Sequence, residues 1–212
     1  MCGIVGVIAK NRIRHMLTDE IFMMCQYQQH RGPDDKGVVA LDLEMRKIRE
    51  VKKCEYINCK GLLGFNRLSI QDLSHNGHQP MQNRNADVSI IFNGEIYNFR
   101  ELRSRLIKKG YVFESGTDTE VILQMYMEYG IEGTLKKLNG MFSFVITDMC
   151  SQKMYIVRDR FGIKPLYIAD ATETFLFASE LKAFLPYRGF VSRLNLAAVE
   201  EYMLFQNIMS DT

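Results

Sequence analysis

The first eight residues constrain this chain most, because they form a short apolar run that begins directly after a cysteine. The apolar residues between positions 4 and 8 are all β-branched and are interrupted by glycine, which is typical of a strand buried on both faces. Removal of Met1 would leave Cys2 with a thiol and a free α-amine, a nucleophile beside its own base. A cysteine near the start of a chain is more commonly inert, so the remaining sequence has to decide between these two interpretations.

Length and composition are those of an ordinary globular protein. The chain has 212 residues, enough for one large domain or two small ones with a substantial core. Hydrophobic residues make up 47% and charged residues 25%, and a net charge of +2 gives no reason to expect nucleic acid or a membrane as a partner. The apolar start lacks a basic leader and breaks at Lys10, so we expect neither a signal peptide nor a membrane span.

The five cysteines are odd in number and widely spaced along the chain. Only Cys54 and Cys59 are near each other, and their spacing does not match a zinc site. We therefore expect free thiols in a reducing cytoplasm.

Strand patterns outnumber helix patterns. Apolar or alternating segments predict strands over residues 38–41, 62–65, 88–92, 142–147, 154–158, 166–169 and 175–178. Residues 44–60 are charged and irregular, which indicates a hairpin or a surface insertion. Many antiparallel strands with a few helices between them predict an α+β fold in which helices cover sheets.

Helix starts are marked by residues that cap the first turn. The expected caps are Thr18, Asn98, Thr117, Ser179 and Asn195, and a glutamate three residues after Asn98 and Thr117 completes a capping box at each. The first helix is expected to run up to Gly32–Pro33, which would stop it.

Several polar clusters stand at strand ends or in loops, where a rigid scaffold commonly presents functional groups. Each has a plain explanation when taken alone: Asn93–Gly94 as a turn, Thr117 as a helix cap, Arg31 as a structural ion-pair residue. The clusters are HRGPDD at 30–35, NRLSI at 66–70, GHQP at 77–80, NGEIYN at 93–98 and SGTDTE at 115–120.

Together with Cys2, these clusters resemble the N-terminal glutaminase domain of class II glutamine amidotransferases of the asparagine synthetase type, which are N-terminal nucleophile hydrolases. The matching stretches are MCGIVGV, HRGPDD, RLSIQDL, GHQPM, NGEIYNFREL, SGTDTEVIL, LNGMFSFVITD, RDRFGIKPLY and ASELKA. The resemblance implies a four-layer αββα sandwich of two antiparallel sheets. It also implies a glutaminase domain over residues 1–190, and over 191–212 the start of a linker to a synthetase domain.

The resemblance implies roles for individual residues. Cys2 would attack the side-chain amide of glutamine with its own α-amine as base, since a free α-amine has a pKa of only about 7.7–8.0. Asn93 and Gly94 would complete the catalytic group by donating hydrogen bonds to the oxyanion. The implied substrate-binding residues are Arg67, Leu68, Ile70, Asn93, Gly94, Glu95 and Asp118. Arg67 would bind the α-carboxylate, and Asp118 with Glu95 would bind the α-ammonium group.

A second group of residues, Arg31, Gly32 and Asp34, is implied to form a loop that shapes the site. The sequence has no Gly-rich phosphate loop, so we expect no cofactor and no metal in this chain. ATP and magnesium are expected only for the synthetase domain. The implied partners are L-glutamine and a synthetase domain in cis or in trans, and a homodimer is considered as the assembly.

The final reaction is left open between alternatives. The resemblance favours asparagine synthesis from aspartate, with amidation of a sugar or of another carboxylate as the alternative. A non-catalytic module that binds glutamine or docks a synthetase is a competing class. Against it stand Cys2, Arg67, Asn93, Gly94 and Asp118, because a decayed site would have lost some of them.

Overall fold

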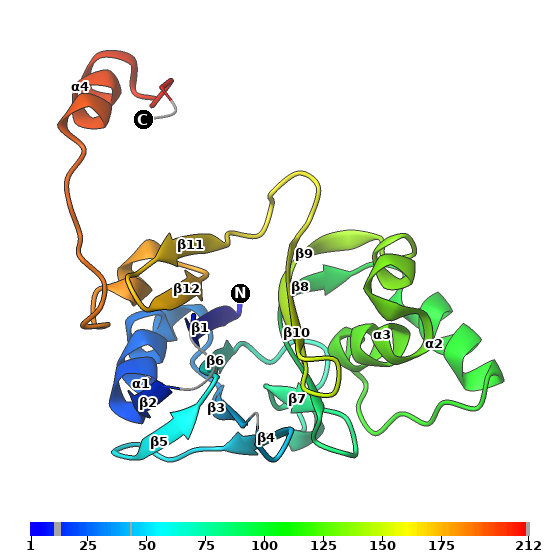
Figure 1. Ribbon diagram of the computed structural model, residues 1–212. Coiled ribbons are helices and arrows are strands. Elements are labelled where there is room, and N and C mark those ends of the chain that lie inside the picture. Colours follow the sequence, from blue (N-terminus) through cyan, green and yellow to red (C-terminus); the bar gives the residue numbers. More distant parts are fainter. Residues whose placement is uncertain (11–13, 43, 211–212) are drawn as a thin grey trace.

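Two antiparallel sheets face each other at the centre of the computed structural model, which describes residues 1–10, 14–42 and 44–210 (Figure 1). The larger sheet has, in spatial order, β11 (Tyr167–Asp170), β12 (Thr174–Ala178), β1 (Gly3–Ala9), β6 (Gly61–Arg67), β3 (Asp35–Asp42) and β4 (Lys47–Glu50). The smaller sheet has β10 (Lys153–Arg158), β9 (Gly140–Asp148), β8 (Val88–Ile96) and β7 (Met81–Gln82). A separate two-stranded ribbon pairs β2 (Arg14–Leu17) with β5 (Tyr56–Cys59).

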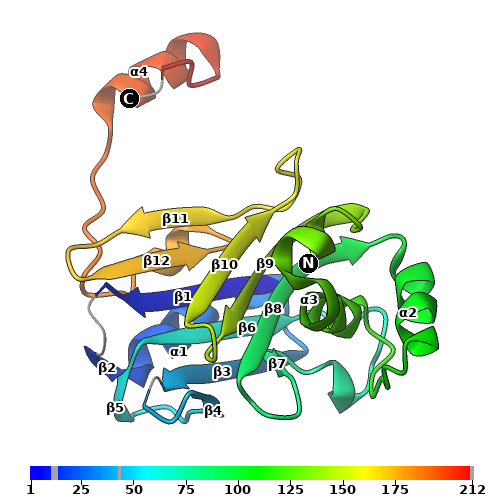
Figure 2. The same ribbon diagram turned by 45° about the vertical axis from the view of Figure 1, so that its right-hand side comes forward.

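Helices cover the outer faces of both sheets. Helix α1 (Thr18–Tyr27) packs on β1 and β6 of the larger sheet, and α3 (Asp118–Leu135) packs on β8 of the smaller one, with α2 (Phe99–Lys108) beside it. The layers therefore run helix, sheet, sheet, helix, and Figures 1 and 2 show them in this order. The predicted α+β fold, a four-layer αββα sandwich, is confirmed.

Strand β1 lies in the middle of this stack and is buried on both faces, as its sequence predicts. Val5 and Val7 face α1, while Ile4 packs between the sheets. Gly6 leaves room for the Phe177 ring, with which an added Cβ would collide. Substitution of this glycine would therefore displace the Phe177 ring from its place between the sheets.

Residues 44–60, predicted as a hairpin or a surface insertion, contribute two strands that pair with strands outside this region. Strand β4 forms a hairpin with β3, and β5 joins the ribbon with β2. Helix α1 ends at Tyr27 and is followed by a short 3₁₀ helix over Gln29–Arg31, so it does not run to Gly32 as predicted. The Thr18 hydroxyl donates to the Lys52 carbonyl and so ties the start of α1 to this region.

Two of the predicted caps are confirmed with their side-chain bonds, Asn98 occupies the predicted N-cap position without such a bond, and Ser179 is wrong. The side chains of Thr117 and Asn195 accept the backbone N–H groups that a cap requires. Asn98 makes no such bond, because its amide binds the loop at residues 137–139 instead. Ser179 accepts the N–H of Ile4, so its hydroxyl braces β1 and leaves the 3₁₀ helix at Leu181–Phe184 uncapped by a side chain.

The end of the chain stands away from the sandwich. An extended segment leads to α4 (Leu196–Phe205), which is separated from both sheets in Figures 1 and 2. None of the side chains of α4 is buried. Among the helices that the structure describes, none is both long and apolar enough to span a membrane.

Candidate active site

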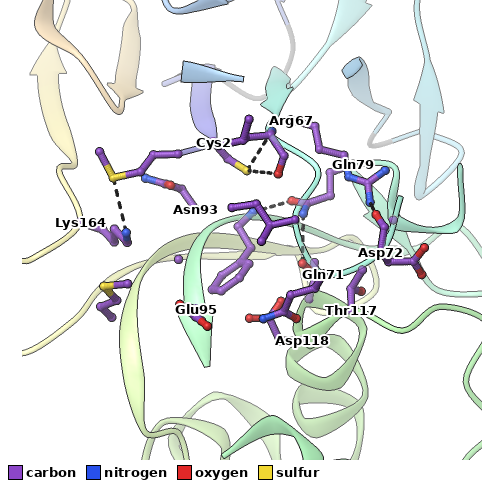
Figure 3. Close-up of a pocket in the computed structure, with 18 residues that line it drawn as sticks. Cys2, Arg67, Gln71, Asp72, Gln79, Asn93, Glu95, Thr117, Asp118 and Lys164 are labelled. Atoms are coloured by element: carbon purple, nitrogen blue, oxygen red, sulfur yellow. Dashed lines mark hydrogen bonds between the residues drawn. The ribbon is translucent and has the colours of Figure 1, made fainter. Parts of the chain in front are cut away.

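Four segments that are far apart in sequence converge at one edge of the sandwich. Cys2 precedes β1, and because β1 runs antiparallel to β6 with Gly3 opposite Asn66, Cys2 lies beside Arg67 at the end of β6. The end of β8 and the first residue of α3, Asp118, approach from the other sheet. Their side chains line a cavity of about 250 Å³ (Figure 3). The cavity also contains Leu68, Ile70, Asn93, Gly94 and Glu95, so the predicted catalytic and substrate-binding residues all line it.

Cys2 presents its sulfur to this cavity. The backbone N–H of Leu68 donates to Sγ at 3.4 Å, and the thiol lies 3.8 Å from the Leu68 carbonyl oxygen. Burial raises the pKa of the Cys2 thiol, and the hydrogen bond from Leu68 and the positive charges of the chain terminus and Arg67 offset this only in part. The thiol is therefore protonated at neutral pH and needs a base to become a nucleophile.

Asn93 and Gly94 form the opposite wall on β8. Asn93 is 1% exposed, and among the residues that the structure describes its Nδ2 has no hydrogen-bond partner. A buried amide donor without a partner is costly, by about 1–3 kcal/mol, and marks a place where a ligand atom can be accepted. At Gly94 an added Cβ would collide with the Met141 carbonyl, so the close pairing of β8 with β9 requires glycine here.

The charged residues lie farther along the cavity. The Arg67 guanidinium is buried and donates to the carbonyl oxygens of Ser74, at 2.9 Å, and of Asp72, which fix its plane. Burial raises the pKa of Asp118 to about 6, although backbone N–H groups including that of Ile96 lower it, and the nearby Glu95 raises it further. A buried carboxyl group with an unfavourable charge is suited to receive a cation.

The predicted loop residues lie behind the cavity wall. Arg31 donates from Nε to the Cys2 carbonyl at 2.9 Å and from Nη1 to Glu180 at 3.2 Å, so it holds the backbone of the cysteine in place. Gly32 lies against the backbone at residues 66–67, where a Cβ would collide. Asp34 accepts the N–H of Ser69 at 2.7 Å. None of these three residues lines the cavity.

Several cavity residues were not predicted individually. Gln79 accepts the N–H of Phe92 at 2.7 Å and donates to Thr119, so it joins the two halves of the wall. Lys164 also lines the cavity. Both lie in motifs that carry the family resemblance, GHQPM and RDRFGIKPLY, and these motifs are the sequence signal for them. Within the described residues, no group of three or more histidine, cysteine or acidic side chains is placed to hold a metal ion.

A four-layer αββα sandwich with a cysteine at the start of its central strand defines the class as that of the N-terminal nucleophile hydrolases. The chain belongs to the glutamine amidotransferase domain family, whose model matches residues 1–212.

The curated relatives and the solved structures give the same result. Asparagine synthetase [glutamine-hydrolyzing] 1 of Bacillus subtilis is 39% identical over 208 residues, which cover 97% of this chain and 30% of that protein. Putative asparagine synthetase [glutamine-hydrolyzing] 2 of Methanocaldococcus jannaschii is 36% identical over 218 residues, covering 95% and 39%. The fold is also similar to glutamine phosphoribosylpyrophosphate amidotransferase from B. subtilis, with a TM-score of 0.73 and 24% identity over 86% of this chain and 43% of that one. The chain thus spans about a third of the length of these curated relatives.

Proposed function

We propose that this domain hydrolyses L-glutamine to glutamate and ammonia through Cys2, and that the ammonia is used for ATP-dependent asparagine synthesis from aspartate. The observation that carries the first part is the unpartnered Nδ2 of Asn93 in the same cavity as the Cys2 sulfur. A nucleophile facing a buried hydrogen-bond donor is the arrangement that acyl transfer requires.

The proposed reaction begins once Met1 has been removed. The freed α-amine takes the proton of the Cys2 thiol, and the thiolate attacks the side-chain amide carbon of glutamine. The amide oxygen becomes an oxyanion, which the Asn93 side chain and the Gly94 N–H stabilise. The protonated amine returns its proton to the leaving nitrogen, so ammonia departs and a thioester remains. Water then hydrolyses the thioester to glutamate and frees the thiol.

Recognition of glutamine is assigned to the charged residues of the cavity. The two carbonyl contacts of Arg67 use only two of the five N–H donors of a guanidinium, which leaves donors for the substrate α-carboxylate. Asp118, with Glu95, takes the α-ammonium group, whose positive charge would relieve the cost of ionising this buried carboxyl. Leu68 and Ile70 line the path between the two ends.

The acceptor reaction lies outside this chain. The names of these curated relatives support asparagine synthesis, and the synthetase domain, in cis or in trans, is the proposed partner. ATP and magnesium are assigned to that domain, and none of the residues described here is assigned a cofactor. Residues 1–190 are proposed as the glutaminase unit and 191–212 as the start of the linker. A cytoplasmic location is supported by the five cysteines, all of which are free.

The test is ammonia release from L-glutamine by the wild-type protein and by Cys2→Ala. We expect the variant to lose all activity above background while its thermal unfolding is unchanged. Cys150→Ala removes an exposed thiol elsewhere and should keep full activity. Equal rates for wild type and Cys2→Ala would contradict the proposal. An inactive wild-type protein that nevertheless binds glutamine would favour the non-catalytic module.

A further inference from the structure

A buried lysine in the cavity wall has no part in the mechanism proposed above. Lys164 belongs to the motif RDRFGIKPLY, is 6% exposed and lines the same cavity as Cys2. Burying an ammonium group is costly, and such a lysine is rarely retained without a partner. We therefore look for a role of the Lys164 ammonium group within this cavity.

The loop that carries Lys164 is held by Asp159. Its carboxylate accepts four backbone N–H groups, from Phe142, Phe161, Ile163 and Lys164, at 3.0 to 3.2 Å. Burial would raise the pKa of Asp159, but these hydrogen bonds keep it below its usual range. The carboxylate is thus a fixed clamp that joins the loop to β9.

Arg158 closes the same loop from its other side. Its guanidinium donates from Nε to the Lys164 carbonyl at 2.7 Å and from Nη2 to the Gly162 carbonyl at 2.6 Å. Gly162 has a φ of +63°, in the left-handed region that favours glycine. The loop backbone is therefore fixed tightly, and the side chain that it directs into the cavity is Lys164 (Figure 3).

The ammonium group points to the residue that the mechanism removes. Lys164 Nζ lies 3.5 Å from the sulfur of Met1, a weak acceptor that cannot balance a buried charge. When Met1 is cleaved, this contact disappears, and the space that it leaves lies between the lysine and the new α-amine of Cys2. On the basis of the proposed function, we infer that Lys164 is a positioning residue whose charge keeps this amine unprotonated, and hence active as the base.

The direction in which Lys164 shifts the pKa of the α-amine follows from electrostatics. A nearby cation disfavours protonation of an amine, which lowers the pKa of the amine from its ordinary value near 7.7–8.0 and increases its neutral fraction at pH 7. Two other cations near Cys2 act in the same direction, but the charge of Arg31 is offset by Glu180 and that of Arg67 is assigned to the substrate α-carboxylate. Arg31 binds the Cys2 carbonyl and Glu180, and Arg67 binds two backbone carbonyls.

The acidic groups oppose Lys164. Glu95 and Asp118 line the cavity from the smaller sheet and α3, and Asp72 lines it from the loop after β6. Each of these carboxylates would favour the protonated amine, which raises the pKa of the amine and lowers its neutral fraction at pH 7. Asp159 adds a further negative charge beneath the lysine loop. Lys164 counters them at the amine as a cavity cation without an acidic partner among the ion pairs of the described residues.

The experiment is the pH dependence of kcat/KM for glutaminase activity, which reports the pKa of the base in the free enzyme. In Lys164→Met the midpoint of the acidic limb should move up by about one pH unit. Lys164→Arg keeps the charge and should keep the wild-type midpoint. Arg160→Met removes an exposed cation from the same loop and serves as the control, also with a wild-type midpoint.

The position of the midpoint distinguishes charge from simple structural support. A Lys164→Met profile that is lowered at every pH with an unchanged midpoint would overturn the inference. Equal shifts in the Met and Arg variants would do so as well, because geometry and not charge would then be responsible. If the Met variant does not fold, Lys164→Gln also removes the charge, and the midpoint of its acidic limb is measured instead. An active Cys2→Ala variant would instead overturn the proposed function, so the two failures can be told apart.

Discussion

Asn93 and Asp118 both carry a free-energy cost in the unliganded protein. Among the described residues, the buried Nδ2 of Asn93 has no hydrogen-bond partner. The pKa of Asp118 is raised to about 6, so its ionisation costs free energy in the folded protein. Functional sites commonly contain such groups, because the ligand supplies the interaction that the folded protein withholds. Each cost gives a separate prediction.

Asn93→Ala should reduce kcat for glutamine hydrolysis by about 10²–10³-fold, since one oxyanion donor is lost. Its stability should fall much less than a buried asparagine in a complete network would suggest, because Nδ2 has no bond to lose. Steady-state kinetics and urea unfolding measure the two effects. Ser89→Ala is the matched control, a buried residue of the same strand with an unpartnered hydroxyl, and should keep its kcat. A kcat for Asn93→Ala close to that of wild type would refute the role.

Asp118→Asn should stabilise the protein at pH 7.5 while it weakens glutamine binding. The pKa of the Asp118 carboxyl is raised from 3.8 to about 6 in the folded state, so its ionisation destabilises the fold. This destabilisation is complete above pH 6 and disappears as the pH falls toward 4. Asparagine avoids this cost, and we expect a gain of about 1–3 kcal/mol at pH 7.5 that shrinks near pH 4. Urea unfolding at the two pH values measures the gain, and KM for glutamine should rise at least tenfold. A variant less stable than wild type at pH 7.5 would contradict this assignment.

At the scale of single residues, the sequence motifs supplied the predicted catalytic and substrate-binding residues, and in the structure all of them line one cavity. The motifs could not predict the hydrogen bonds that hold these residues in place. The bond from Arg31 to the Cys2 carbonyl and that from Gln79 to the Phe92 N–H depend on chain segments meeting in space. Spacing along the chain carries no such information.

The segment before α3 shows how one element positions Asp118, the carboxylate proposed to bind the substrate ammonium group. Glu120 is buried and its carboxylate accepts the backbone N–H groups of Glu114 and Ser115, at 2.9 and 2.7 Å, and the Ser115 hydroxyl at 2.6 Å. Thr117 caps the helix through the Glu120 N–H. The first turn of α3, where Asp118 lies, is thus fixed by its own sequence.

Glu120→Ala should lower the free energy of unfolding by about 2–4 kcal/mol, because it leaves buried donors without an acceptor. Glu120→Gln keeps one acceptor oxygen and should lose less. Urea unfolding gives the values. Glu132→Ala, at an exposed position of α3 beyond its kink at Gly130, should stay within about 0.5 kcal/mol of wild type. Equal stabilities for the two alanine variants would show that this carboxylate does not hold the turn.

At the scale of elements, local signals succeeded where the partner is local and failed where it is distant. Thr117 and Asn195 cap their helices with side-chain bonds to residues three positions on. Asn98 and Ser179 have equally good local patterns, yet their side chains bind residues 137–139 and Ile4, which are remote in sequence. A buried or bridging bond to a distant strand outweighs a cap that water can replace.

The whole molecule consists of a closed sandwich and an exposed C-terminal helix. Apolar side chains of α4 are exposed on every side, among them Leu196, Met203, Leu204 and Phe205. The stability of the sandwich should therefore not depend on this helix.

A chain that ends at residue 190 should unfold within about 2 °C of the full chain and keep its glutaminase rate, because no buried side chain is removed with α4. A chain that ends at residue 180 is the comparison. It loses Ala183 and Phe184, both fully buried under α1, and should unfold at a much lower temperature or not fold. Scanning calorimetry compares the three chains. A large loss of stability on removing only 191–212 would contradict the proposed boundary.

At the scale of the whole molecule, the order of strands and helices indicated an α+β fold, but not which helix covers which sheet. The residues of β1 are apolar on both faces, and β8 is buried along most of its length although one face carries Ser89, Asn93 and Glu95. Periodicity alone therefore does not say which face of either strand a helix covers. The layering depends on pairings such as Gly3 with Asn66 and on Gly6 admitting Phe177 from another strand. The family resemblance implied the four layers, and the structure confirms them.

The most direct test of the central claim is the intact mass of the active protein, before and after rapid acid quenching in the presence of L-glutamine. We predict that the resting protein lacks one methionine residue. We also predict that a fraction of the quenched protein carries one glutamyl group, which peptide mapping places on Cys2 and which is missing from Cys2→Ala. Retention of Met1 in fully active protein, or a glutamyl group on another residue, would contradict the account.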